Sequence, residues 1–501
     1  MWNKKLYTSF LFIVLNLCSI AQSKNDEASL IKSISGLLLD EITLAPLPYA
    51  NVIVIGENKG VTTNEKGFFS IKDVHSSDSL GFHYIGYEQK NISVNDLTNG
   101  QSVYLKEEII SLNEFFVFAN NHNAEDIVKN VLKNKDANYK RIDSKKQLFI
   151  RQRYISNVDK IEINFKKSSF AQLDEKMTEI LEEKIPKQSI SYTDFLGYIY
   201  MSNNSKDSIK LNPIKVVSLK DKSVADLDQL EKLFTKMFSN TKENEYWKVK
   251  SGIIGGKVDV NGSSSGSNLD SLSEFYKNNL NVNSYAKRLD SRFKGLLDDK
   301  KKWDFLHHTS NYEYTLVGGT KVNGEDVFII EFKPKKNGEL IGKVYIAIDT
   351  YALVKADFKY DIGKTGTNIQ MFGVGYTLNQ LEISIYFEKN EGTYQLKYYA
   401  QKAGNKVSFD RNVSLLKKKK RFLVDKELNE IKVRLNMRSR EESSFELLVL
   451  DNKKISNQTY VNYNQKDYFK IIYVDQFNDN IWKGYDIIEP TKQMRDYKKL
   501  E

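Results

Sequence analysis

Cysteine, histidine and proline are scarce in this chain, and long apolar runs are missing from most of it. Its 501 residues include 1 cysteine, 5 histidines and 6 prolines. A single cysteine cannot form an internal disulfide, so the fold must be stabilised by core packing. Five histidines leave little material for a histidine-based catalytic or metal centre. Beyond the N-terminal segment, no stretch approaches the ~18 apolar residues of a membrane-spanning helix, so we expect none in the mature chain.

Aromatic residues, in contrast, are abundant. The 29 tyrosines and 27 phenylalanines favour β-structure, because aromatic side chains suit a pleated, half-buried surface. The hydrophobic content of 40% is that of a globular protein. The length predicts roughly two to four domains.

The first residues have the layout of a secretory signal peptide. Lys4 and Lys5 precede the apolar stretch 11–17, and small residues follow up to a cleavage site before Gln22. A retained anchor helix is the weaker interpretation, because the apolar stretch is far shorter than the ~20 residues needed to span a membrane. We therefore expect a signal peptide at 1–21, export across the inner membrane, and a location in the periplasm or at the outer membrane.

Cys18 raises the question of lipidation. A lipoprotein signal carries Gly, Ala or Ser directly before the acylated cysteine, whereas Leu17 is bulky. We therefore do not expect lipidation at Cys18. Cleavage after residue 21 removes Cys18 and leaves no thiol in the mature chain.

The formal net charge is +10, from 75 basic and 65 acidic residues. Nucleic acid is the usual partner of such a charge, but an exported protein rarely meets it. Anionic lipid headgroups remain as partners, and an evenly solvated basic surface is the simpler alternative.

Residues 30–119 contain short apolar runs separated by turn residues. Runs at this regular spacing predict a β-sandwich. The predicted strands are 33–39, 50–55, 67–71, 79–84, 91–94 and 102–105.

One stretch in this region, NVIVIGENKGVTTNEKGFFSI at 51–71, has the glycines of a phosphate-binding loop but not its strand–helix context. We interpret it as strand–turn–strand. Gly60 would permit a tight backbone entry and Gly67 a left-handed turn conformation. Val52 and Phe68 are expected to face inward.

A helical connector is predicted at 120–140, because the stretch 124–132 places its apolar residues on one helical face. The remainder, 141–501, is predicted to be a larger antiparallel β-domain. Asn323-Gly324 is a strong two-residue hairpin turn within it. A helical insertion is expected at about 224–305, because apolar residues recur there at helical spacing.

No catalytic constellation emerges from the sequence. His122 and Glu125 form an H-x-x-E pair, but it lies in a polar break rather than at a strand end, and its third ligand would have to come from His307 or His308. Adjacent histidines on a strand point to opposite faces and cannot easily chelate one metal together. We therefore predict a protein that is not an enzyme, without zinc carboxypeptidase activity, catalytic residues, metal or cofactor.

Two groups are candidates for binding. The densest basic run could contact an anionic surface, although a hairpin tip guarded by lysines explains it more simply; the run is Lys417, Lys418, Lys419, Lys420 and Arg421. A set of strand aromatics could line a concave apolar face, although core packing is the simpler explanation for each; the set is Tyr312, Tyr314, Phe328, Phe332, Tyr345 and Phe358.

The stretch 33–114 resembles the carboxypeptidase-regulatory-like domain, a transthyretin-like β-sandwich of Bacteroidetes envelope proteins. The residues that carry the resemblance are Ile34-Ser35-Gly36, Leu39-Asp40, the segment 46–52, the segment 60–64, Gly67-Phe68-Phe69, the segment 80–87 and Leu112-Asn113-Glu114. The same domain is found at the N-terminus of TonB-dependent receptors, whose plug pattern does not follow here. The resemblance implies an accessory sandwich without the zinc ligands of the carboxypeptidases.

The rest of the chain is similar to other Bacteroidetes proteins that carry this domain, in the stretches 124–139, 338–355 and 482–490. The strand series 312–360 also resembles the open, curved sheet of periplasmic lipoprotein carriers. We expect a non-catalytic cell-envelope protein that binds a ligand, apolar or glycan, or an envelope protein. A structural or assembly module docked on an outer-membrane protein and an undetected hydrolase remain as alternatives.

Overall fold

The computed structural model describes residues 31–57, 59–108, 123–170, 173–204, 206–220, 241–242, 244–252, 254–258, 278–294, 296–485 and 487–497. The chain divides into two compact units. The N-terminal unit comprises Met1–Glu108 with Ile487–Thr491, and the C-terminal unit comprises Ile109–Asp486 with Lys492–Glu501. Both are built mainly from β-strands, which confirms the predicted fold class.

The N-terminal unit contains two sheets. One has the strand order β3 (Gly60–Thr62), β2 (Asn51–Val54), β5 (Ser79–His83), β6 (Lys90–Ser93). The other has the order β4 (Phe68–His75), β1 (Ile31–Asp40), β7 (Gln101–Leu105). Phe69 and Phe82, one from each sheet, meet edge to face with ring centroids 5.4 Å apart within a single buried core. All six predicted strands are therefore present as a sandwich.

The predicted inward face of the 68–71 segment is wrong by one residue. Phe69 is buried, whereas Phe68 is only half-buried. The register explains the difference, because Phe69 lies opposite Gly36, where the missing side chain leaves room for the ring. Val52 is buried as predicted.

Gly67 has the predicted left-handed conformation, with φ of +72°. A Cβ at this position would lie 2.5 Å from the carbonyl oxygen of Leu38, so the turn requires glycine for space as well as for conformation.

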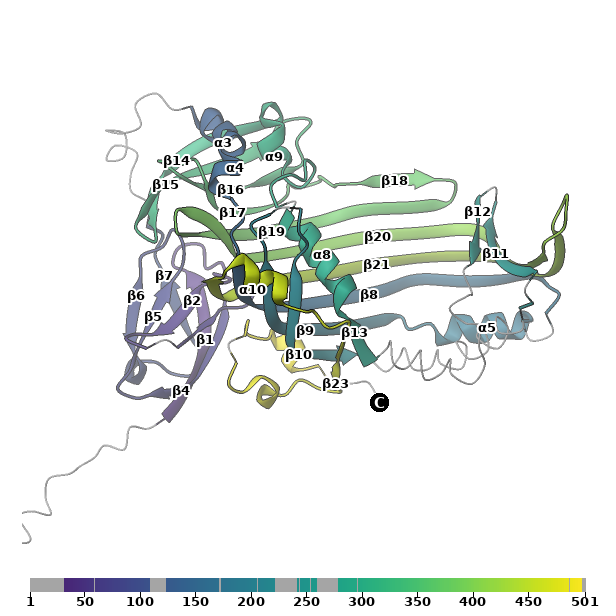
Figure 1. Cartoon of the computed structure of the whole chain (residues 1–501), viewed down its shortest axis with the longest axis horizontal. Helices are drawn as coiled ribbons and strands as arrows, with labels where there is room; N and C mark the ends of the chain where they lie inside the picture. The colour runs from purple at the N-terminus through teal and green to yellow at the C-terminus, as the bar shows by residue number, and fades with distance from the viewer. Residues whose placement is uncertain are drawn as a thin grey trace, which may run out of the picture. The chain divides into compact units, whose positions relative to one another are not determined.

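The C-terminal unit is organised around one large sheet (Figure 1). Neighbouring strands of this sheet pair antiparallel, except that β23 pairs parallel with β10. Three further strands lie off the main order: β18 pairs with β19, β11 pairs with β20, and β12 pairs with β11. In spatial order the strands are β14 (Tyr312–Val322), β15 (Glu325–Pro334), β16 (Leu340–Ala347), β17 (Leu353–Tyr360), β19 (Val374–Asn390), β20 (Thr393–Lys419), β21 (Lys426–Lys454), β8 (Ser144–Ser168), β9 (Gln188–Met201), β10 (Lys210–Lys220) and β23 (Ile472–Val474). The three further strands are β18 (Asn368–Met371), β11 (Glu245–Ser251) and β12 (Ile254–Val258).

The predicted turn between β14 and β15 is present. Asn323 and Gly324 both have positive φ, 50° and 80°, as a two-residue hairpin turn requires. The predicted connector helix is α3 (Ala124–Lys133), which begins at the N-cap Asn123 and buries one apolar face.

Helix α8 (Val282–Lys294) covers part of one face of the large sheet. The ring of Tyr285 lies 5.1 Å from that of Phe195, and its hydroxyl oxygen accepts a hydrogen bond of 3.3 Å from Gln152. On the opposite face, Trp482 packs edge to face on Phe149 at 5.4 Å. The sheet is therefore covered on both faces in this region.

The remaining α-helices of the described residues are short: α4 (Lys135–Asn138), α5 (Glu175–Lys184), α9 (Asp304–His307), α10 (Asn457–Asn462) and α11 (Lys492–Arg495). The insertion predicted as helical is mixed, because β11, β12 and β13 (Asn279–Asn281) precede α8 within it. β13 pairs with β22 (Tyr468–Lys470). The apolar stretch 227–238 lies outside the described residues. Among those that are described, no helix is long and apolar enough to cross a membrane.

Candidate ligand-binding site

The aromatic residues predicted to line a concave face do not share one face. Strand pairing places Tyr345 opposite Ile329, on the other side of the sheet from Phe328 and Phe332. Phe332 stacks on Phe305 of α9 at 4.1 Å. The relative exposures of Tyr312, Phe328, Phe332, Tyr345 and Phe358 lie between 0% and 4%, and Tyr314 is half-buried. On the α9 side, a packed cluster of rings forms around Phe305 and consists of Tyr312, Tyr314, Phe332 and Phe358.

The basic run is divided by the structure. Lys417, Lys418 and Lys419 are the last residues of β20, and Lys420 and Arg421 belong to the turn that follows. Lys417 pairs with Glu245 at 2.9 Å and Lys418 with Glu427 at 3.6 Å. Only part of the run therefore points freely to solvent.

His307 and His308, which were considered as zinc ligands, contact different groups of the protein. His307 hydrogen-bonds the carbonyl of Leu297 at 2.9 Å, and His308 contacts Asp304 at 2.6 Å. Glu125 pairs with Lys129 at 2.9 Å, and its partner His122 lies outside the described residues. Within the described ranges, no group of three His, Cys, Asp or Glu side chains could hold a metal.

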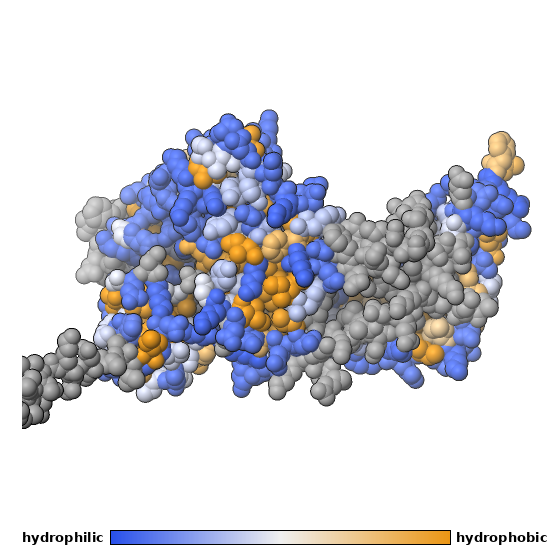
Figure 2. Space-filling view, turned by 60° about the horizontal axis from the view of Figure 1, so that its bottom comes forward, coloured by the Kyte–Doolittle hydropathy of each residue, from blue (hydrophilic) through white to orange (hydrophobic). Residues whose placement is uncertain are grey.

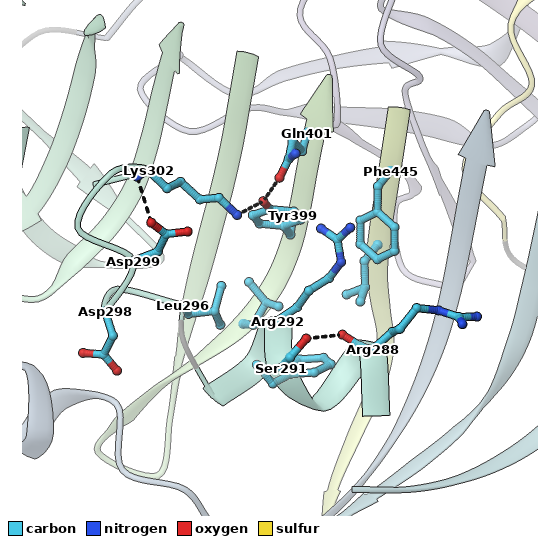
Figure 3. A pocket seen from close by; sticks show the side chains of 13 residues that line it. Arg288, Ser291, Arg292, Leu296, Asp298, Asp299, Lys302, Tyr399, Gln401 and Phe445 are labelled. Carbon is cyan, nitrogen blue, oxygen red and sulfur yellow. Dashed lines mark hydrogen bonds between the residues drawn. The ribbon is translucent and has the colours of Figure 1, made fainter. Parts of the chain in front are cut away.

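A pocket of about 620 Å³ opens between α8, the segment that follows it, and the face of β20 and β21. Figure 3 shows Arg292 and Lys302 extending toward the sheet side chains Phe445 and Tyr399. The guanidinium carbon of Arg292 lies 4.1 Å from the Phe445 ring centroid. Lys302 Nζ donates to the Tyr399 hydroxyl at 3.2 Å, and burial together with Arg292 lowers the pKa of this lysine.

A second pocket of about 600 Å³ adjoins the first. The two share Phe293, Leu296, Asp298 and Leu396 as lining residues, so we describe them together as the basic trough. Seven cationic side chains line the basic trough against three aspartates: Lys135, Lys140, Arg141, Lys146, Arg288, Arg292 and Lys302.

Lys146 is the most unusual of these cations. It is 2% exposed, and its Nζ donates to Gln395 Oε1 at 2.9 Å. Burial, reinforced by the neighbouring Arg141, lowers the pKa of Lys146 to about 8. No carboxylate of the described residues lies within ion-pair distance of it. A buried ammonium group that has only an amide partner is strongly desolvated and poorly compensated.

Arg141 provides a second incompletely satisfied cation. Its Nε donates to the carbonyl of Ser202 at 3.1 Å, and its Nη1 lies 4.0 Å from Asp290. Both terminal nitrogens are buried and have no hydrogen-bond acceptor in the part of the chain that the structure describes. The basic trough therefore offers donors to an anion beside an apolar wall.

The aspartates of the basic trough are already engaged. Asp298 pairs with Lys135, and Asp299 accepts the backbone N–H groups of Lys301 and Lys302 at 3.1 Å each. Asp136, the third, lies 3.9 Å from Lys135, and its side chain is 97% exposed. These contacts leave the carboxylates poorly placed to neutralise Lys146 and Arg141.

This site was not predicted from the sequence, although one signal was present. Lys146 stands two and four residues before the core residues Leu148 and Ile150, so the period of two along β8 places it on the inner face. Sequence gives no comparable signal for the residues of α8 and 296–302 that complete the site.

A family model described as "CarboxypepD_reg-like domain" matches residues 34–117. This match covers the sandwich strands and the residues on which the resemblance was based. Residues 34–117 form a CarboxypepD_reg-like domain. Residues 112–117, where the domain motif ends, lie outside the described residues.

Solved structures resemble the chain over larger parts. The structure of Pseudomonas aeruginosa MucA/MucB is 7% identical and has a TM-score of 0.16; the match covers 63% of this chain and 94% of that one. The putative outer membrane lipoprotein-sorting protein domain from Vibrio parahaemolyticus is 10% identical, with 68% and 97% covered and a TM-score of 0.18. The LolA superfamily protein NE2245 from Nitrosomonas europaea is 9% identical, with 69% and 99% covered and a TM-score of 0.16. At these values the matches carry no functional argument. No curated protein matches the chain.

The unit that contains the CarboxypepD_reg-like domain also incorporates residues 487–491, which were predicted to belong to the β-rich region. Ile488 forms a parallel bridge with Thr62, and Asn64 Nδ2 donates to the carbonyl of Pro490 at 3.1 Å. Ile488, Glu489 and Pro490 are all buried. A late segment of the chain is thus built into this N-terminal unit.

Proposed function

We propose that this protein is a non-catalytic binding protein of the cell envelope whose basic trough holds an anionic amphiphile. The observation that carries the proposal is Lys146, a buried ammonium group beside the two unsatisfied nitrogens of Arg141. A carboxylate, sulfonate or phosphate group bound there would supply the acceptors that the described residues do not.

In the unliganded state, the buried ammonium group of Lys146 has no anionic partner among the described residues. Burying a cation without an opposite charge destabilises the fold, and replacing such a group by an apolar side chain often stabilises it. A binding site explains why such a destabilising arrangement is useful, because an anionic ligand recovers the desolvation energy through charge-assisted hydrogen bonds.

The apolar side of the basic trough selects for an amphiphile. Phe293, Leu296 and Leu396 lie where the two pockets meet, and Met201 and Phe387 extend the apolar lining beside Lys146. Each pocket is within the roughly 300–1,000 Å³ range of small-molecule sites. An alkyl chain against these residues would leave its charged end near Lys146 and Arg141.

Support for an envelope location comes from two features. The N-terminal residues have the pattern of a signal peptide, and the CarboxypepD_reg-like domain is an accessory sandwich of envelope proteins in the family that the sequence resembles.

Isothermal titration calorimetry with an alkyl sulfonate, compared with an alkyl glucoside of equal chain length, tests the proposal. The sulfonate should bind at least about tenfold more tightly, and Lys146→Met should remove that difference. Lys145→Met is the matched control, because Lys145 lies next along β8 on the opposite face, over the Tyr198 ring at 4.1 Å. Equal affinity for both amphiphiles, or equal loss in both variants, would contradict the proposal.

A further inference from the structure

The hairpin of β20 and β21 ends in three consecutive apolar side chains that are almost completely exposed. Phe422 is 101%, Leu423 is 87% and Val424 is 79% exposed. We call residues 420–426 the hairpin tip. Figure 2 shows an orange group projecting at the right-hand end of the molecule, where this hairpin ends in Figure 1. Contiguous exposed apolar residues of this kind mark an interaction site.

The hairpin tip is held in place by the surrounding structure. Asp425 accepts a hydrogen bond of 3.1 Å from the backbone N–H of Arg421 and one of 2.6 Å from the Tyr246 hydroxyl. The Lys420 N–H donates to the carbonyl of Asn244 at 2.8 Å. Strand β11, which carries Tyr246, pairs with β20 up to Lys419. The three apolar side chains are therefore presented outward by a braced turn.

Cations surround the apolar group. Lys420, Arg421 and Lys426 are exposed, and no ion pair engages their side chains within the described parts of the chain. Asp425, the carboxylate within the hairpin tip, accepts hydrogen bonds from the Tyr246 hydroxyl and the Arg421 N–H, and these bonds lower its pKa. The next lysines of the run, Lys417 and Lys418, are neutralised by glutamates. Positive charge that remains free is thus concentrated beside the apolar group.

We propose that the hairpin tip inserts into the surface of an anionic lipid bilayer. Phe422, Leu423 and Val424 would enter the boundary between headgroups and acyl chains, and Lys420, Arg421 and Lys426 would contact lipid phosphates. An apolar group with adjacent cations matches the order of layers in such a membrane, apolar below and negatively charged above. This inference is independent of the basic trough.

Co-sedimentation of the full chain with vesicles tests the inference. Vesicles containing phosphatidylglycerol should bind the chain at least about tenfold more tightly than vesicles of phosphatidylcholine alone, and added salt should reduce this preference. One variant carries Phe422→Ser, Leu423→Ser and Val424→Ser, and a second carries Lys420→Ser, Arg421→Ser and Lys426→Ser. Each should lose about tenfold in binding to the anionic vesicles. The apolar stretch 11–17 is the same in all variants, so differences between them report on the hairpin tip.

Ile362→Ser is the control, because Ile362 is an equally exposed apolar residue, 98%, outside the hairpin tip. It should bind vesicles as the unchanged chain does, and all variants should keep their melting temperature and their affinity for the alkyl sulfonate. The inference is overturned if both hairpin-tip variants bind like the unchanged chain or if Ile362→Ser loses as much. Failure of the unchanged chain to prefer anionic vesicles also overturns it and points to a protein partner.

Discussion

Asn64 joins two parts of the N-terminal unit that are 426 residues apart in the sequence. Its Nδ2 donates to the Pro490 carbonyl at 3.1 Å, while its Oδ1 accepts the backbone N–H groups of Lys66 at 2.8 Å and Phe68 at 3.1 Å. Asn64 is 1% exposed; its bond to Pro490 is buried, and the two bonds that its Oδ1 accepts are part-buried. One amide thus shapes the turn before β4 and fixes the 487–491 segment in the same unit.

Asn64→Ala should destabilise this unit by about 2–4 kcal/mol, because buried backbone groups lose their partners. Hydrogen exchange of the 62–71 segment should accelerate by at least about tenfold. Asn99→Ala is the control, since Asn99 Oδ1 accepts only exposed hydrogen bonds, from the Ser35 N–H at 3.0 Å and the Ser35 hydroxyl at 3.5 Å. Equal protection in Asn64→Ala and the unchanged chain would show that the link is not stabilising.

Asp40 should make the N-terminal unit sensitive to acid. Burial alone would raise its pKa, but hydrogen bonds from Thr43, Tyr87 and Ile42 outweigh burial and lower the pKa below 3.8. A carboxyl group with a lowered pKa in the folded state stabilises the fold above its ordinary pKa, and this contribution is lost as the pH falls through the lowered value.

The melting temperature of the unit should therefore fall on acidification below about pH 4, and fall less in Asp40→Asn. Tyrosine circular dichroism between about pH 5 and 2 measures it. The same acid dependence in both proteins would assign the effect to other carboxylates.

The buried ion pair of Arg151 and Asp194 should respond differently to single and double substitution. Arg151 donates to the two carboxylate oxygens at 2.9 and 2.8 Å, and the side chains are only 4% and 1% exposed. Arg151→Met leaves Asp194 buried without its cation, which should cost about 3–5 kcal/mol, and a further Asp194→Leu should recover most of that loss.

Urea unfolding followed by tryptophan fluorescence reports on this region, since Trp247, Trp303 and Trp482 lie in the C-terminal unit. Arg440→Met, which breaks the exposed pair with Asp159, should have a much smaller effect. If the double variant is no more stable than Arg151→Met, the loss comes from other contacts of the arginine.

Ligand binding should depend on pH through Lys146. An anion favours the protonated amine, and the pKa of this lysine in the free protein is about 8. Affinity for an alkyl sulfonate should be constant below that pH and fall above it, by up to about tenfold per pH unit, because the free protein must first take up a proton. The sulfonate and Arg141 keep their charges in this range. Calorimetry should show no such fall with Lys146→Met.

Four features could be predicted from sequence, because each depends on residues close together in the chain. They are the sandwich, the Gly67 turn, α3 and the hairpin at Asn323 and Gly324. Phe68 was assigned to the core in place of Phe69 because two adjacent aromatics do not reveal which alternation the sheet uses. The bond from Asn64 to Pro490 has no local signal at all.

The candidate site was predictable only in part for the same reason. The inward position of Lys146 follows from the alternation along β8, but its lack of a carboxylate partner depends on α8 and on strands far away in sequence. The basic run was visible, yet its division into neutralised and free lysines required the positions of Glu245 and Glu427.

Thermal denaturation of the unchanged chain and of Lys146→Met, with and without an alkyl sulfonate, tests the central claim most directly. The lowered pKa of about 8 corresponds to a cost of about 3 kcal/mol at neutral pH for a charged amine that is buried beside Arg141, and the loss of the donor to Gln395 offsets about half of the gain. Without ligand, Lys146→Met should therefore melt higher than the unchanged chain, and with ligand only the unchanged chain should gain substantially in melting temperature. A variant that melts lower without ligand and gains as much with it would show that Lys146 serves the fold rather than the ligand.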